Sequence, residues 1–123
     1  DQGCITCHMG NLLGGSMYQK MGIYANYSET IGTKKDDLGR YMVTKSDADK
    51  YMFKVPSLRN IDQTAPYFHD GAVESLEESV RLMGKIQLNK ELTEEQVKDI
   101  VIYLRSLTGE VPIEYQKAPE LPI

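Results

Sequence analysis

The chain has 123 residues, which is the length of a single domain. Acidic residues outnumber basic ones, 18 to 14, and the net charge of −4 argues against nucleic acid as the main partner, because phosphate binding needs a basic surface. No apolar run approaches the roughly 20 residues of a membrane-spanning helix, so we expect no membrane insertion.

The first half of the chain is predicted to be poor in regular structure. Residues 1–9 carry two cysteines and are expected to form a short helix. From Gly10 to Lys50 the chain is rich in Gly, Tyr, Asn, Asp and Lys and lacks a sustained helical period, which predicts a long loop with a helical turn near 46–50. So long a loop in a compact domain needs something other than secondary structure to organise it.

The second half is predicted to form two amphipathic helices. A capping box begins the first at Ser75, its apolar face carries Met83, and Gly84 is expected to end it. A second capping box begins the other helix at Thr93, and Gly109 follows its end. Its apolar stripe is predicted to comprise Val97, Ile100, Val101, Leu104 and Leu107.

The last residues, 110–123, contain three prolines and are expected to form an extended tail packed on the domain that spans residues 1–109. No segment alternates well enough to predict a core strand. We therefore expect an all-α fold of few helices and long loops.

Cys4, Cys7 and His8 form a C-x-x-C-H motif, the attachment signature of c-type haem. Two thiols three residues apart on a helical turn reach two vinyl groups of one porphyrin edge, and the next residue can place an imidazole under the iron. A dithiol redox pair would need a βαβ setting, and tetrahedral zinc would need a fourth ligand when His69 is the only other histidine. We therefore predict one covalent haem with His8 as an iron ligand, organising a class I cytochrome c-like fold.

The second iron ligand is open on the residues alone. Met9 and Met17 lie too close to the attachment turn to reach the opposite haem face, whereas Met42 and Met52 are not excluded. Met83, at the end of an amphipathic helix, has the best case. His69 lies in an aromatic turn and is the other candidate; we prefer that it orders this turn or binds a haem propionate.

Several stretches together resemble one known family. Residues 53–60 (FKVPSLRN), 64–71 (TAPYFHDG) and 76–80 (LEESV), together with Met83-Gly84 and the ending 104–109 (LRSLTG), are similar to the C-terminal haem domain of bacterial dihaem cytochrome c peroxidases. The resemblance covers nearly the whole chain and is more specific than C-x-x-C-H alone.

The resemblance implies a high-potential, electron-accepting haem with His and Met ligands. It assigns the second ligand to Met83, which follows the histidine of the aromatic turn by the family's interval of 14 residues. It also implies a calcium site at the backbone carbonyls of Thr64 and Pro66, although its other half would come from a domain this chain lacks. Arg59 is our candidate to pair with a haem propionate.

Peroxide chemistry in that family takes place at a second haem, whereas this sequence has one C-x-x-C-H motif. We therefore expect a monohaem electron-transfer protein rather than an enzyme, working with redox protein partners. The alternative is the electron-accepting domain of a peroxidase that reduces hydrogen peroxide. Covalent haem attachment requires export, so we expect a periplasmic or other extracytoplasmic location and, because the chain begins at Asp1, a mature or trimmed form.

Overall fold

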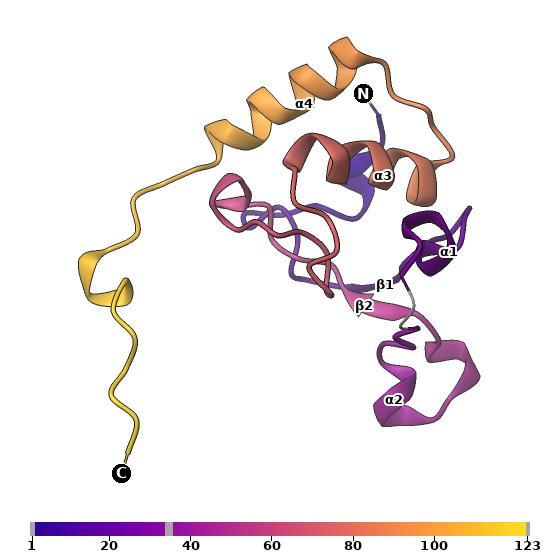
Figure 1. Cartoon of the computed structure of the whole chain (residues 1–123), viewed down its shortest axis with the longest axis horizontal. Coiled ribbons are helices and arrows are strands. Elements are labelled where there is room, and N and C mark those ends of the chain that lie inside the picture. The colour runs from indigo at the N-terminus through magenta and orange to yellow at the C-terminus, as the bar shows by residue number, and fades with distance from the viewer. Residues whose placement is uncertain (1, 34–35, 123) are drawn as a thin grey trace.

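The computed structural model describes residues 2–33 and 36–122. Its largest elements are α3 (Leu76–Leu88) and α4 (Glu94–Ser106), which pack against each other along the upper side of Figure 1. The main core cluster lies between these helices and the aromatic turn. Its buried members are Tyr67, Val73, Leu76, Val80, Val97, Val101 and Leu104.

Both helices begin where their caps predict. The Ser75 side chain accepts the backbone N–H of Glu78, and Thr93 and Gln96 form a complete capping box. These bonds satisfy backbone donors that the first helical turn leaves unpaired. The predicted apolar stripe of α4 is confirmed, since its three buried residues all belong to it.

The predicted end of α3 at Gly84 is wrong. The helix continues to Leu88 and ends at Asn89, whose φ of 52° is left-handed. Gly84 is instead a packing residue, because a Cβ there would lie 2.9 Å from the Leu92 side chain. The glycine lets the turn into α4 fold back onto α3.

The first half contains short elements rather than one continuous loop. Strand β1 (Tyr18–Lys20) pairs antiparallel with β2 (Met52–Lys54), with Tyr18 opposite Lys54. The prediction of an all-α chain therefore misses a two-stranded sheet, because three-residue strands are too short to show an alternating pattern. Two small helices complete this half: α1 (Tyr27–Ile31) and α2 (Tyr41–Thr44).

Three 3₁₀ turns complete the body of the domain: Cys4–Thr6, Asp47–Asp49 and Ile61–Gln63. The first lies at the cysteine motif and the second within 46–50, so both short helical predictions are confirmed. No helix of the described ranges is long and apolar enough to cross a membrane.

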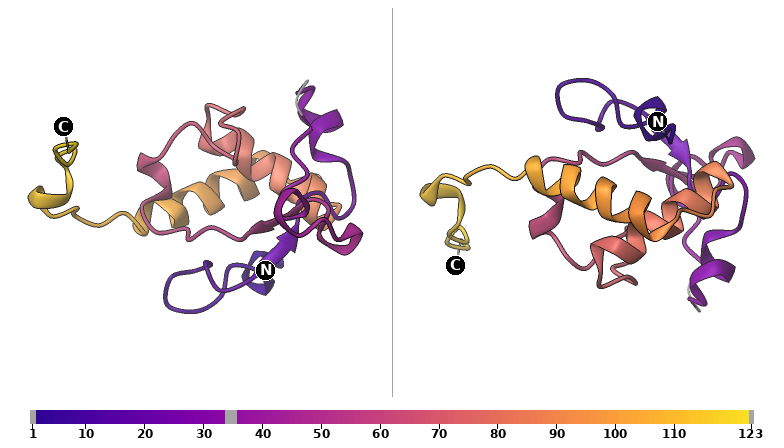
Figure 2. Two further views of the ribbon diagram at one scale, coloured as in Figure 1. Left: turned by 90° about the horizontal axis from the view of Figure 1, so that it is seen from below. Right: turned by 90° about the horizontal axis from the view of Figure 1, so that it is seen from above.

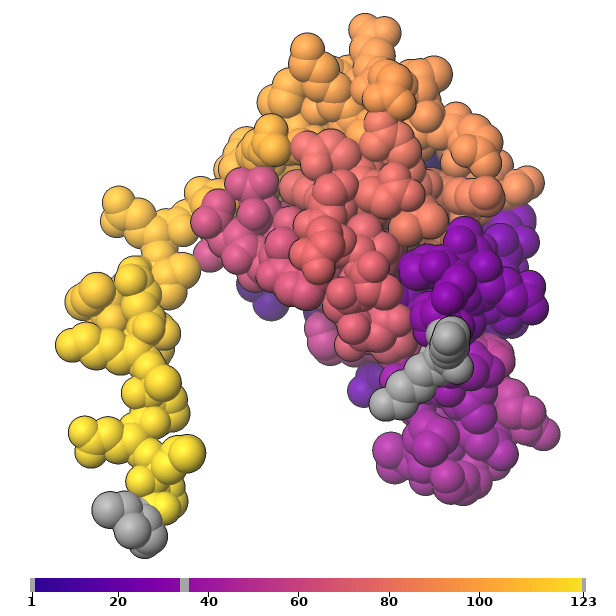
Figure 3. All heavy atoms as spheres, in the orientation of Figure 1, coloured from indigo at the N-terminus to yellow at the C-terminus, as the bar shows by residue number. Residues whose placement is uncertain are grey.

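The tail differs from its predicted packing. Residues 110–122 are exposed, contain one 3₁₀ turn at Ile113–Tyr115, and run away from the body in Figures 1 and 2. The space-filling view in Figure 3 shows the same separation. Prolines and polar residues interrupt the apolar residues of this segment, so it presents no continuous stripe to the domain.

Candidate haem-binding site

The C-x-x-C-H motif forms one tight turn. The backbone N–H groups of Cys7 and His8 both donate to the carbonyl of Cys4, at 3.2 and 3.0 Å. Residues at i, i+3 and i+4 of a helical turn share a face, so both thiols and the imidazole project from the same side. Cys4 is exposed, Cys7 is half-buried, and both are free thiols. This is the arrangement that attachment to one porphyrin edge requires.

The His8 ring is oriented by the backbone. Its Nδ1 lies 3.2 Å from the carbonyl oxygen of Leu13. A carbonyl only accepts, so Nδ1 carries the hydrogen and the Nε2 lone pair is left for a metal. Burial lowers the pKa of His8, which favours the neutral imidazole that an iron ligand must be. His8 therefore fits the predicted ligand role on its own geometry.

Gly14 holds this arrangement together and was not predicted to do so. A Cβ at Gly14 would lie 2.0 Å from the Pro56 carbonyl oxygen and 3.3 Å from His8 Nδ1, and its φ of +133° is unfavourable for other residues. The Leu13 carbonyl that binds His8 also accepts the backbone N–H of Leu58, at 3.2 Å. The adjacent glycines were the available signal, but the segment they meet is more than 40 residues away.

Met83 lies on α3, half-buried, one turn after the buried Val80 and beside the buried Gly84. Of the other methionines considered, Met42 is 56% exposed and Met9 is 47% exposed, whereas Met52 lies half-buried on β2. Burial therefore favours Met83 over Met42, and its ligand role stays a prediction.

His69 contacts two aromatic rings and keeps part of its side chain exposed. Its ring stacks on Phe53, with centroids 4.3 Å apart, and tilts against Tyr27 at 5.1 Å. Its Nε2 lies 3.9 Å from a carboxylate oxygen of Asp37. The neighbouring Asp70 accepts a short hydrogen bond from the Tyr27 hydroxyl, and this bond adds to the burial that raises the pKa of Tyr27. These contacts agree with the preferred interpretation that His69 orders its turn.

Arg59 has a partner inside the His8 loop. Its Nε and Nη2 both donate to the carbonyl oxygen of Asn11, at 2.8 and 2.6 Å. The guanidinium thus ties the loop that follows the haem motif to the segment after β2. The pairing of Arg59 with a propionate stays a prediction, and this carbonyl competes for the same donors.

Thr64 and Pro66, the predicted calcium ligands, are both exposed. The Thr64 hydroxyl donates to the carbonyl of Ile61. Across residues 2–33 and 36–122, no group of three or more His, Cys, Asp and Glu side chains could hold a metal ion. The calcium role therefore rests on backbone carbonyls alone and stays a prediction.

Gln87 is a second bridging residue that the sequence did not reveal. Its side-chain oxygen accepts the backbone N–H groups of Gly22 and Ile23, at 2.5 and 3.2 Å, while its amide donates to the Lys20 carbonyl. The α3 helix is thereby fixed to the segment that leaves β1. Pairs 64 to 67 residues apart leave no local pattern in a sequence.

No family model matches the chain. The cytochrome c551 peroxidase of Nitrosomonas europaea is 50% identical over 89% of this chain, and that of Pseudomonas aeruginosa is 42% identical over 97%. The chain is homologous to one part of the bacterial cytochrome c peroxidases. It spans about a third of their length: 32% and 34% of these two relatives.

Two further matches agree with this relationship. The cytochrome c peroxidase Ccp of Escherichia coli is 46% identical over 89% of the chain, which covers 23% of that relative. A solved MauG-like protein associated with microbial copper homeostasis superposes with a TM-score of 0.70 at 25% identity, covering 89% of this chain and 43% of the other. The helix-rich fold with long loops thus resembles part of a MauG-like protein, which is a coarser result than the class I cytochrome c fold expected.

The expectation that the protein is not an enzyme is wrong. Relatives at 42% to 50% identity over most of this chain are named as peroxidases. The single C-x-x-C-H motif led to that expectation, but a motif count in a chain of this span describes only the part of the relatives that it matches.

Proposed function

We propose that this chain is the electron-accepting haem domain of a cytochrome c peroxidase that reduces hydrogen peroxide. The observation that carries the proposal is the His8 geometry: an imidazole whose Nδ1 is held by a backbone carbonyl, on the turn that presents both cysteines. The peroxidase relatives support the reaction class, and their greater length supports a separate site for peroxide chemistry.

We assign four residues to one haem. Cys4 and Cys7 would form the two thioether links, His8 Nε2 would bind the iron, and Met83 would supply the second ligand. The bound haem supplies a one-electron ferrous/ferric couple, and a thioether ligand raises its potential. The chain's own contribution is to hold the imidazole: Leu13 orients it and Gly14 leaves room for it against Pro56.

The partners follow from the same assignment. Electrons would come from a reduced redox protein such as a small cytochrome, and would leave toward the peroxide-reducing part of the protein. Covalent haem attachment would place this chemistry in the periplasm or another extracytoplasmic compartment. Calcium at the carbonyls of Thr64 and Pro66 belongs to the proposal only if a neighbouring domain completes the site.

The test uses the full haem-loaded protein that contains this chain. We expect it to oxidise a reduced c-type cytochrome when hydrogen peroxide is added. Met83→Ala should abolish the weak near-infrared band of a methionine-bound ferric haem and reduce turnover by at least tenfold, whereas the neighbouring Leu82→Ala should keep the band. Absence of peroxide-dependent oxidation in the parent protein would refute the proposed function.

The ligand assignment is tested separately by the spectrum. If Met83→Ala keeps the near-infrared band and His69→Ala changes the haem spectrum, the second ligand is not Met83. Such a result would leave the peroxidase proposal intact while correcting the residue.

A further inference from the structure

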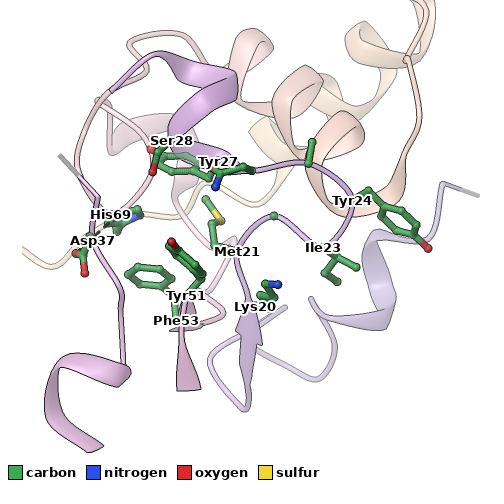
Figure 4. A pocket seen from close by; sticks show the side chains of 13 residues that line it. Lys20, Met21, Ile23, Tyr24, Tyr27, Ser28, Asp37, Tyr51, Phe53 and His69 are labelled. Atoms are coloured by element: carbon green, nitrogen blue, oxygen red, sulfur yellow. Dashed lines mark ion pairs between the residues drawn. The ribbon is translucent and has the colours of Figure 1, made fainter. Parts of the chain in front are cut away.

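A cavity of about 200 Å³ lies between the segment that leaves β1 and the aromatic turn. Figure 4 shows Met21, Tyr51, Phe53 and His69 grouped together below Tyr27, with Lys20 beside them. Sites that enclose a whole small molecule usually measure roughly 300–1,000 Å³. The cavity can therefore take one edge of a large planar ligand, but not the whole of it.

The cavity is fixed to the helix that carries Met83. Gln87, one helical turn beyond Met83, bonds Gly22, Ile23 and Lys20 through its side chain. The carbonyl of Ile86 also accepts the backbone N–H of Tyr24, at 2.9 Å. Hydrogen bonds thus connect one wall of the cavity to α3, the helix that carries the proposed second iron ligand.

The same cavity is also linked to the loop at Gly14 and Gly15 that lies beside His8. Lys20 ends β1 and Phe53 lies on β2, which pair with each other. Just beyond this pairing, Val55 accepts the backbone N–H of Gly15 at 2.7 Å, and the next residue is the Pro56 that Gly14 contacts. Hydrogen bonds and strand pairing therefore connect the cavity wall both to α3 and to the loop beside His8.

The cavity lining combines apolar surface with a lysine, Lys20, that forms no ion pair within the described ranges. The hydroxyls of Ser28 and Tyr51 already donate to Asp36, and His69 faces Asp37. Within the described ranges Lys20 makes no ion pair with any carboxylate. Its ammonium can donate to an anionic ligand, and Met21 and Phe53 provide apolar surface for packing.

We propose that this cavity receives the carboxylate edge of the haem and that Lys20 is the charge partner of a propionate there. The inference rests on the proposed haem assignment and goes beyond it. The two propionates of a porphyrin lie away from the vinyl groups, so a haem linked at Cys4 and Cys7 needs its charge partner on another element. Arg59, the expected partner, already spends two of its five N–H donors on the Asn11 carbonyl, so Lys20 would be a second charge partner beside it.

The experiment compares three variants of the haem-loaded full-length protein: Lys20→Gln, Lys20→Arg and the control Lys98→Gln. Lys98 is an exposed lysine of α4 that does not line the cavity, so it carries the same charge change. Two properties are measured: the propionate bending band by resonance Raman spectroscopy, and the reduced-to-oxidised ratio of the haem at a fixed applied potential.

We expect Lys20→Gln to shift the Raman band and to lower the reduced-to-oxidised ratio by about tenfold, because losing a charge roughly 12 Å from the iron favours the ferric state. Lys20→Arg should restore most of the ratio, and Lys98→Gln should change it less than twofold. An unmoved band in Lys20→Gln, or a ratio equal to that of Lys98→Gln, would overturn the proposal.

These outcomes separate the two proposals. Neither measurement depends on peroxide turnover, so an inactive protein with a shifted Raman band refutes the peroxidase function and supports the Lys20 assignment. A parent protein without covalent haem refutes both.

Discussion

Residues 76–106 bury a continuous apolar stripe, whereas residues 2–24 fully bury none of their large apolar side chains. Six of these side chains are exposed: Ile5, Met9, Leu12, Tyr18, Ile23 and Tyr24. The first region is stabilised by hydrophobic burial and capped helices; the second is shaped by backbone hydrogen bonds and positive-φ glycines. This difference indicates that the N-terminal region needs another apolar body to pack against, and the covalent haem is that body in the proposed function.

Preventing haem attachment should have the largest effect on the difference between the two regions. Cys4→Ala combined with Cys7→Ala should remove the covalent haem, as measured by intact mass. Amide hydrogen exchange should then become fast throughout residues 2–24, while the amides of Val97–Leu104 stay protected because their core does not involve the haem. The exposed Ser16→Ala is the control. Equal protection in both regions of the double variant would show that the N-terminal region is stable on its own.

Gly14→Ala should have the next largest effect. The added Cβ would collide with the Pro56 carbonyl in a backbone conformation that alanine avoids, so we expect a loss of about 3 kcal/mol or more in the free energy of unfolding. Denaturant unfolding measures the change.

The neighbouring Gly15 provides a matched control. It also has a positive φ, +82°, but nothing lies within 4 Å of an added Cβ. Gly15→Ala should therefore cost only the conformational strain, about 1 kcal/mol. Equal losses for the two variants would mean that the contact with Pro56 does not hold the His8 loop.

Sequence reasoning was most reliable where the physical cause is local. The turn at Cys4, the cap at Thr93 and the apolar stripe of α4 each depend on residues within one or two helical turns. The strands were missed because each has three residues, and their pairing joins segments more than 30 residues apart. The bridging role of Gln87 and the contact between Gly14 and Pro56 were missed for the same reason.

Gly84 shows a different limit. A glycine after a predicted apolar stripe is typical of a helix end, and that interpretation was wrong here because tertiary packing decides its role. The candidate site likewise contains residues that the sequence reveals and residues that only the folded structure reveals. The two cysteines and His8 are recognisable from their spacing, whereas Lys20 and the cavity beside it become visible only when the chain is folded.

Gly84→Ala tests the packing role within the stable region. The new Cβ would lie 2.9 Å from Leu92 and 3.1 Å from the carbonyl oxygen of Lys90, so the turn between α3 and α4 must shift. Overpacking costs about 1–3 kcal/mol and the better helix propensity of alanine returns about 1 kcal/mol. We expect a net loss of about 1–2 kcal/mol by denaturant unfolding, against less than about 0.5 kcal/mol for the exposed Lys85→Ala. If Gly84→Ala were more stable than the parent protein, the packing role of Gly84 would be refuted.

Thr93→Ala should give the smallest of these effects. It removes the hydroxyl that accepts the backbone N–H of Gln96 at 3.2 Å, a cap whose loss costs about 1 kcal/mol. Thr93→Ser keeps the oxygen and should unfold at the parent's denaturant concentration. Because α4 packs through its buried stripe, the loss should leave the haem spectrum unchanged, in contrast to Gly14→Ala, which acts beside His8. A change in the haem spectrum of Thr93→Ala would mean that the two regions are coupled, and that helix α4 contributes to the geometry of the haem site.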